Sequence, residues 1–247
     1  MLVLLPPSET KAPGGDGPPL RLDSLSHPEL TPTRRKLADE LVGLAGQGAA
    51  GLTALGLSKS QYSELERNAA LWTAPTLPAL QRYTGVLYDA LDVGSLRPAE
   101  RARAGARLAV ASALFGLLGA DDPVPGYRLS AASSLPGLGT VRSVWRPVLA
   151  AQLATLTGLV IDLRSGSYIM LGPLPGAVTV RVLCEDSRGR RSTVSHHNKA
   201  HKGRLARLLA TAPREVTTAD GVAKLARRGG LVVERTGERT LDLVVPA

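Results

Sequence analysis

The sequence predicts a mixed α/β fold in which helices cover a central, mostly parallel sheet. Three near-continuous apolar runs, residues 2–5, 107–115 and 159–163, are separated by helical patterns. Strands of a parallel sheet are buried on both faces, so they read as continuous apolar runs rather than as alternating ones. No internal repeat or break in composition divides the 247 residues. We therefore expect one compact domain over residues 1–247.

Two hairpins complete the predicted sheet. Residues 176–184 form an expected strand that closes on a turn at 186–189, and 192–196 is its expected return strand. Residues 231–235 and 240–245 form the expected terminal hairpin.

Helices are predicted where apolar residues recur at helical spacing. Thr31 with Pro32 indicates one helix start, and Ser58 with Gln61 forms a capping box at another. The expected helices span 31–48, 49–55, 58–71, 75–83, 143–156, a stretch from Lys199, and 218–228. A short turn at Gly56 makes the segment resemble, in outline, the helix-hairpin-helix of DNA-binding proteins. A plain helical hairpin is the favoured alternative, within a helical subregion of about 31–83.

Composition indicates a basic protein with a core of Leu, Val and Ala. Aromatic residues make up 3% of the chain, the formal net charge is +9 and the sequence pI is about 10.2. Such a balance fits a nucleic-acid or phosphate partner without requiring one.

The densest basic stretch runs from Arg188 to Arg214. It contains three of the four histidines and no Asp or Glu. Its cations are Arg188, Arg190, Arg191, Lys199, Lys202, Arg204, Arg207 and Arg214. With Asn198 as the expected N-cap, the helix from Lys199 has one apolar face and one cationic face. Clustered cations favour an anionic partner, although a solvated surface helix is the simpler alternative.

Several kinds of chemistry are excluded by the motifs. The chain has no GxGxxG or GxxxxGK[ST] loop, no GxSxG elbow, no HExxH and no CxxC pair. Asp121 and Asp122 have no spaced third ligand, and the lysines beside His196, His197 and His201 oppose a cation. We therefore expect no metal and no cofactor, and the histidines are expected to supply either extra positive charge or hydrogen bonds to phosphate. Enzymatic activity is left open, with a binding role favoured.

Nothing in the sequence indicates export or a membrane partner. The run MLVLLPP is too short for a signal peptide, and no apolar stretch is long enough to span a membrane. Cys184 is the single cysteine, so no internal disulfide is possible, and a buried inert thiol is expected in preference to a redox sensor. A cytoplasmic location is expected.

Polar loops follow the predicted strands. These are residues 8–11, 127–128 and 164–168, and in a mostly parallel sheet such loops gather at one edge. Their Ser, Lys, Arg and Tyr side chains suit a phosphate backbone or a small phosphorylated or carboxylated ligand. The Gly- and Pro-rich loop 12–19 is expected either to be disordered or to order over a ligand.

Five segments resemble the YaaA peroxide-stress family and together cover nearly the whole chain. They read MLVLLPPSETK, GVLYDALD, ASALFGLLGADDPVPGYRLS, VIDLRSGSY and NKAHKGRLAR. The resemblance implies a cytosolic bacterial protein that limits hydrogen-peroxide damage and is linked to lower free iron. It also implies a compact α/β fold with a positively charged cleft, a helix-hairpin-helix-like element and DNA binding.

The resemblance also marks a set of site residues. With the two cations that continue the basic helix, the expected anion-binding set is Ser8, Thr10, Lys11, Tyr127, Arg128, Ser165, Tyr168, Lys199, Lys202, Gly203, Arg204 and Arg207. Ser167 stands where the family usually has an acidic residue, and the Lys-rich tract that often follows Tyr168 is absent. A DNA-backbone site tolerates these departures, whereas a catalytic site would not. The alternative is an enzyme or binder that holds a small anion with the loop 8–11 and Arg128.

Overall fold

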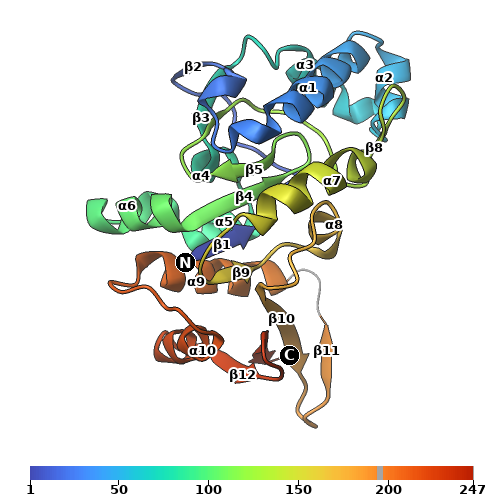
Figure 1. Cartoon of the computed structure of the whole chain (residues 1–247). Coiled ribbons are helices and arrows are strands. Elements are labelled where there is room, and N and C mark those ends of the chain that lie inside the picture. Colours follow the sequence, from blue (N-terminus) through green and yellow to red (C-terminus); the bar gives the residue numbers. More distant parts are fainter. Residues whose placement is uncertain (194–196, 247) are drawn as a thin grey trace.

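An eight-stranded sheet forms the centre of the protein, seen in a computed structural model that describes residues 1–193 and 197–246. The strand order is β12-β13-β10-β9-β1-β4-β5, with β11 paired to β10 (Figure 1). The strands are β1 (Leu2–Leu5), β4 (Leu108–Ser112), β5 (Gly116–Gly119), β9 (Val160–Asp162), β10 (Val178–Glu185), β11 (Arg191–Thr193), β12 (Val232–Arg235) and β13 (Thr240–Pro246).

Parallel pairing holds the middle of this sheet. β1 pairs in parallel with β4 on one side and β9 on the other, and β10 pairs in parallel with β9 and β13. β5, β11 and β12 join antiparallel, each beside its neighbour in sequence. Val3, Leu4 and Leu5 are fully buried, as expected for a strand covered on both faces. The predicted mixed α/β fold and the terminal hairpin are confirmed. The first hairpin is confirmed as far as Thr193, and the rest of its predicted return strand, 194–196, lies outside the described residues.

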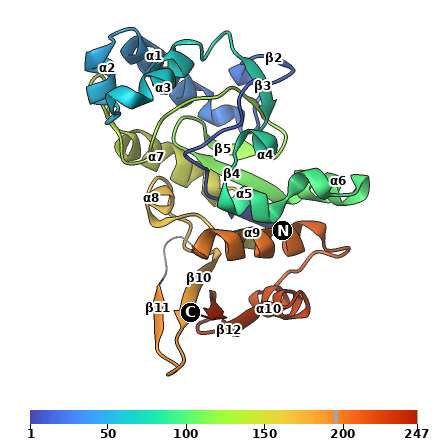
Figure 2. The same cartoon turned by 180° about the vertical axis from the view of Figure 1, so that it is seen from behind.

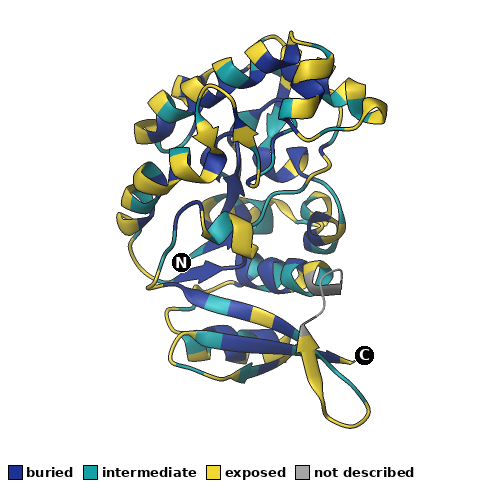
Figure 3. Ribbon diagram, turned by 90° about the vertical axis from the view of Figure 1, so that its right-hand side faces the viewer, coloured by how far each residue is buried: buried dark blue, intermediate teal, exposed yellow. Residues whose placement is uncertain are grey.

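Helices surround the sheet and have exposed outer faces and buried inner faces (Figure 3). They are α1 (Thr31–Ala45), α2 (Ala49–Ala54), α3 (Tyr62–Ala69), α4 (Ala79–Arg82), α5 (Val86–Leu91), α6 (Pro98–Arg107), α7 (Val141–Ala154), α8 (Gly166–Ile169), α9 (His197–Thr211) and α10 (Ala219–Arg228). α1, α2 and α3 lie together at one end of the molecule, and α10 and the β10–β11 hairpin lie at the other (Figures 1 and 2). In the described part of the chain, no helix has the length and apolar character needed to cross a membrane.

Ser58 and Gln61 form the predicted capping box, at the start of a short 3-10 turn that leads into α3. The helix predicted over 75–83 is wrong in its first half. Residues Pro75–Pro78 form β3, which pairs with β2 (Gly17–Pro19) and β6 (Pro123–Val124), and only α4 is helical. Proline lacks the N–H that a helix interior needs, and Pro75 and Pro78 stand at the two ends of β3, the middle strand of this small sheet.

The loop 12–19 is held by a buried side chain. The guanidinium of Arg82 donates hydrogen bonds to four main-chain oxygens, those of Ala12, Gly14, Pro75 and Val124. Leaving such a buried donor without acceptors is costly, so the loop is ordered by Arg82 and by β2–β3 pairing. The sequence could not indicate this, because the partners lie about 70 positions apart in the chain.

The apolar run 107–115 divides into three structural parts. Arg107 ends α6, β4 covers Leu108–Ser112, and residues 113–115 turn into β5. Gly116 takes φ +75° after this turn, in contact with Trp145. The run is apolar except for Arg107 and Ser112 because the turn is as buried as the strands beside it. α9 begins at His197, one residue before the proposed cap Asn198, whose side chain lies outside the described residues.

Gly203 lets α9 pack closely on α5. A Cβ atom at this position would overlap the carbonyl oxygen of Leu87 and lie 2.9 Å from the Cβ of Ala90. Gly203 is therefore a packing residue, and it sets the distance between α9 and α5.

We predict that Gly203→Ala destabilises the protein by about 1–3 kcal/mol, because the added methyl group overpacks the α5–α9 contact. Gly43→Ala is the matched control, since Gly43 also lies in a helix but a Cβ added there would have no other atom within 4 Å. The control gains up to about 1 kcal/mol from helix propensity. Urea unfolding of both variants measures the difference, and equal stabilities would contradict the close contact.

Candidate functional site

A cavity of about 770 Å³ opens at the carboxyl edge of the central strands. In open α/β sheets this edge is where ligands bind. The residues that line it come from the loop after β1, the start of α5, the loop after β9 with α8, β10, and α9. They are Pro6, Pro7, Ser8, Glu9, Thr10, Thr84, Gly85, Val86, Leu87, Tyr88, Ser130, Leu163, Arg164, Ser165, Gly166, Ser167, Tyr168, Val180, Arg181, Val182, Lys199 and Lys202.

Hydroxyl groups form one wall of this cavity. Ser8 Oγ lies 3.1 Å from Thr10 Oγ1, and Thr84 Oγ1 donates to Thr10 Oγ1 at 3.2 Å. Gly85 has φ +97°, and a Cβ there would come within 3.4 Å of both Ser8 Oγ and Thr10 Oγ1. Glycine adopts this positive φ without strain and has no side chain, so the hydroxyl groups of Ser8 and Thr10 can lie close to the start of α5.

Lys11 lies buried beneath the loop rather than in the cavity lining. Its Nζ donates to the carbonyl oxygens of Ser8 at 3.1 Å and Glu9 at 3.4 Å, and it lies 4.3 Å from the ring centroid of Tyr127. Burial lowers the pKa of Lys11 to about 7, an effect that the nearby Glu9 carboxylate opposes. The ammonium thus shapes the 8–11 loop by holding two of its carbonyl groups inward.

Tyrosine hydroxyls connect β4 to the segment around Lys11. Ser112 Oγ accepts hydrogen bonds from the N–H groups of Leu114 and Phe115 and lies 2.7 Å from Tyr127 OH, which lies 2.8 Å from Tyr83 OH. Because Ser112 already accepts two bonds, its own proton points to Tyr127.

Burial keeps these phenols protonated. It raises the pKa of Tyr83 to about 12 and that of Tyr127 well above its usual value. Burial also raises the pKa of Tyr168, and the Glu9 carboxylate adds to that shift. Tyr127 and Tyr168 are therefore hydrogen-bond donors at neutral pH, a state that favours ligand binding over proton abstraction.

Two cations reach the cavity from α9. Lys199 is exposed, and Lys202 is half-buried with its Nζ donating to the carbonyl oxygen of Leu163 at 3.0 Å. Burial lowers the pKa of Lys202, while Asp162 opposes the shift. Asp162 forms a buried ion pair with Arg164 at 2.7 Å, which fixes the loop after β9.

Arg128 is close to the same loop through an ion pair with Glu9. Only part of the predicted set lines this cavity. Six of the predicted site residues line the cavity, namely Ser8, Thr10, Ser165, Tyr168, Lys199 and Lys202. Lys11, Tyr127 and Arg128 support its wall from behind or beside.

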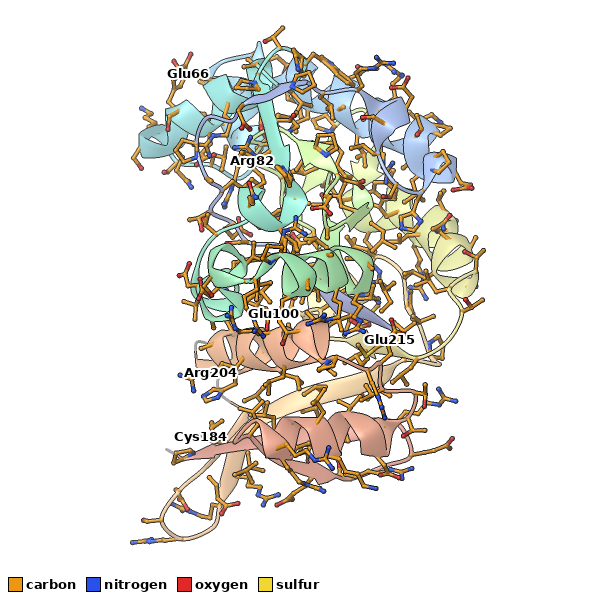
Figure 4. All side chains as sticks on the ribbon, turned by 90° about the vertical axis from the view of Figure 1, so that its left-hand side faces the viewer. Glu66, Arg82, Glu100, Cys184, Arg204 and Glu215 are labelled. Carbon is orange, nitrogen blue, oxygen red and sulfur yellow. The ribbon has the colours of Figure 1, made fainter. Side chains whose placement is uncertain are left out.

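Three further residues of the predicted anion-binding set do not line the cavity. Arg207 donates to the carbonyl oxygens of Leu91 and Asp92 at 2.7 and 2.6 Å, so it joins α9 to the end of α5. Arg204 is exposed and projects from the surface of α9 without lining the cavity (Figure 4). Gly203 acts through packing, as described above.

The basic stretch 188–214 also offers fewer cations to an anionic partner than the number of its Lys and Arg residues indicates. Arg190 pairs with Asp186 at 2.7 Å, and Arg191 bridges Glu185 and Glu234, each at 2.6 Å. These carboxylates lie outside the stretch, so counting its own residues overstated its free charge. The side chains of His196 and His197 lie outside the described residues, and His201 is half-buried.

Several lining residues were missed by the sequence analysis. Thr84, Gly85 and Tyr88 line the cavity beside the loop after β1, and Tyr88 OH donates to the carbonyl oxygen of Pro6 at 2.8 Å. The only available signal was the local cluster of polar-tipped tyrosines around 83–89. No sequence pattern indicated that Arg181 lines the cavity, because its position there depends on the pairing of β10 with β9.

Metal and thiol chemistry receive no support at this edge of the sheet. Among residues 1–193 and 197–246, no group of three His, Cys, Asp or Glu side chains is placed to hold a metal ion. Cys184 is half-buried on β10 and lies outside the cavity lining, near the hairpin (Figure 4).

Fold and site together define an α/β protein with a hydroxyl-rich, partly cationic cavity at the carboxyl edge of its sheet. A family model described as peroxide stress protein YaaA matches residues 1–235. The chain belongs to this family.

Bacterial relatives match over nearly the full length. A UPF0246 protein of Corynebacterium efficiens is 51% identical over 99% of this chain and 100% of its own. A UPF0246 protein of Corynebacterium glutamicum is 46% identical over the same shares, and one of Streptomyces coelicolor is 46% identical over 91% of this chain and 87% of its own.

We predict that Lys11→Met removes a pH dependence of stability. With its folded-state pKa near 7 and its unfolded-state value near 10.5, Lys11 binds more protons in the unfolded chain between these two pH values. The free energy of unfolding of the wild type therefore rises with pH across this window, by a few kcal/mol at most, and is level below it. Urea unfolding at pH 7 to 10 compares the two proteins. A constant difference between them would contradict the burial effect.

Proposed function

We propose that the chain acts in bacterial peroxide stress by binding DNA through phosphate contacts at the mouth of the cavity. The observation that carries the proposal is the meeting of Lys199 and Lys202 with the hydroxyl groups of Ser8, Thr10 and Ser165 around one concavity. Lysine and hydroxyl donors are the groups that contact phosphate oxygens without reading sequence.

Charge supports the same proposal. The net charge of +9 attracts a polyanion over the whole surface, and the exposed Lys199 and Arg204 lie on one helix beside the cavity. Contacts of this kind favour binding without sequence preference. The proposed role belongs to the cytoplasm, where DNA bound in this way is shielded from peroxide and iron chemistry.

The helical segment of α2 and α3 is a second place where the DNA backbone could be gripped. Gly56, between the two helices, has φ +65°, the backbone conformation that a tight glycine turn needs. We assign this segment a supporting contact rather than the main one, since the hydroxyl and lysine donors gather at the cavity.

We predict that Lys199→Glu/Arg204→Glu weakens duplex binding at least about tenfold and lowers the steepness of its salt dependence by about one to two units in log–log slope. Lys224→Glu/Arg228→Glu on α10 is the matched control, because both are exposed and the change in net charge is equal. Fluorescence anisotropy with a labelled duplex at several salt concentrations measures both. Equal losses in the two variants would mean that binding follows total charge and not this site.

A small phosphorylated or carboxylated ligand is the second candidate. It is favoured by the size of the cavity and by the apolar walls contributed by Leu163, Val180 and Val182, which a DNA backbone does not need. Pockets of this size and mixed lining are typical of small-molecule sites.

A thermal-shift screen of nucleotides and phosphorylated metabolites tests this candidate. We predict that Ser8→Ala/Thr10→Val reduces the affinity of any stabilising compound by roughly two- to tenfold per lost hydrogen bond. Ser63→Ala on the exposed face of α3 is the control. If no compound in the screen stabilises the protein, the DNA proposal stands alone.

A further inference from the structure

Glu9 gives the cavity a carboxylate of its own. Among the described residues that line the cavity it is the one acidic side chain, and the other charged groups of the lining are cations. Its carboxylate pairs with Arg128, and 54% of the Glu9 side chain is exposed against 23% for Arg128. An anionic ligand that enters the cavity therefore meets a cation already occupied by an internal anion.

Arg128 is held more firmly than its partner. The fully buried Asn68 of α3 clamps its main chain, accepting from Arg128 N–H at 2.7 Å and donating to the Arg128 carbonyl oxygen at 2.9 Å. Glu9 sits on the exposed loop after β1. The main chain that carries the Arg128 guanidinium is therefore fixed in place, whereas the more exposed Glu9 side chain has room to change its rotamer.

Glu9 also balances neighbouring charge. Its carboxylate acts on the buried Lys11 and on Tyr168, and the Arg128 guanidinium acts on the same two groups. These four side chains form one electrostatic cluster at the wall of the cavity. If Glu9 left, the Arg128 guanidinium would lose its ion-pair partner beside the cavity.

Exchange of Glu9 for a ligand anion costs little. A partly exposed ion pair contributes little to stability, because water screens the two charges. A phosphate or carboxylate presents the same oxygen geometry to a guanidinium, and phosphate adds charge.

We propose that Arg128 is a second anion subsite of the cavity and that Glu9 occupies it until a phosphate or carboxylate of the ligand displaces it. The inference rests on the proposed function, since it takes the cavity as the place where an anion binds. It also specifies the ligand class, which carries at least two negatively charged groups. One group lies at Lys199 and Lys202, and the other replaces Glu9 at Arg128.

The test compares Glu9→Gln with Glu100→Gln. Glu100 lies on α6, pairs with Arg97 and does not line the cavity (Figure 4). Both substitutions remove one negative charge, and glutamine preserves the capping role of Glu100. The probes are a labelled DNA duplex and inorganic pyrophosphate, measured by anisotropy and calorimetry at fixed salt.

We expect Glu9→Gln to bind both probes about three- to tenfold more tightly than wild type, and Glu100→Gln to change affinity less than about twofold. In an Arg128→Gln background, Glu9→Gln should give no gain, since there is no guanidinium to release. The Asn68 clamp acts on the main chain of Arg128, so Arg128→Gln is expected to fold, which its thermal unfolding verifies.

Each outcome separates the two proposals. Equal gains in Glu9→Gln and Glu100→Gln, or a gain that persists without Arg128, would overturn the subsite while DNA binding stands. Tighter pyrophosphate binding by Glu9→Gln without any duplex binding would overturn the DNA proposal and keep the subsite. Absence of binding by every variant to both probes would overturn both.

Discussion

The parallel pairing of β1 with strands on both sides is the constraint on which the site depends. Val3, Leu4 and Leu5 have no exposure, because β4 and β9 flank the strand and helices cover its faces. Pro6 and Pro7 follow at once and lack the N–H groups that would continue the ladder. The chain must therefore leave the sheet at its carboxyl edge, where the loop after β9 also emerges. One short strand thereby fixes where two polar loops meet.

Buried cations bonded to carbonyl oxygens hold the irregular parts of the fold. Arg34 donates to Ser26, Phe115 and Leu117, and Arg107 donates to the last carbonyl groups of α9. Arg82 and Lys11 do the same for the loops beside the cavity. Each such side chain satisfies main-chain oxygens that regular structure leaves unpaired. Part of the basic composition is thus used inside the protein, and the net charge overstates what an anionic partner meets.

The chemistry of the cavity favours holding a ligand over transforming it. Burial keeps its phenols, Tyr88 and Tyr168, protonated, Lys202 is bound to a main-chain oxygen, and Lys199 is exposed. The lining has hydroxyl donors, cations and one carboxylate, but that carboxylate is engaged by Arg128. Ser167, where related sequences are expected to have an acid, fits the same interpretation. These groups recognise phosphate or carboxylate oxygens.

By itself the sequence determined the strands of the central sheet except β5, its two hairpins and most helices, because burial on both faces and helical periodicity are local patterns. It also placed the loops 8–11 and 164–168 at one edge, since parallel strands end together. Only the tertiary structure decided that 75–78 is a strand, that Arg82 orders the loop 12–19, and that Arg207 and Gly203 serve packing. The tertiary structure also decided which cations of 188–214 remain available, because Glu234 comes to Arg191 from 43 positions away. Such pairings depend on distant segments meeting in space, which no local pattern records.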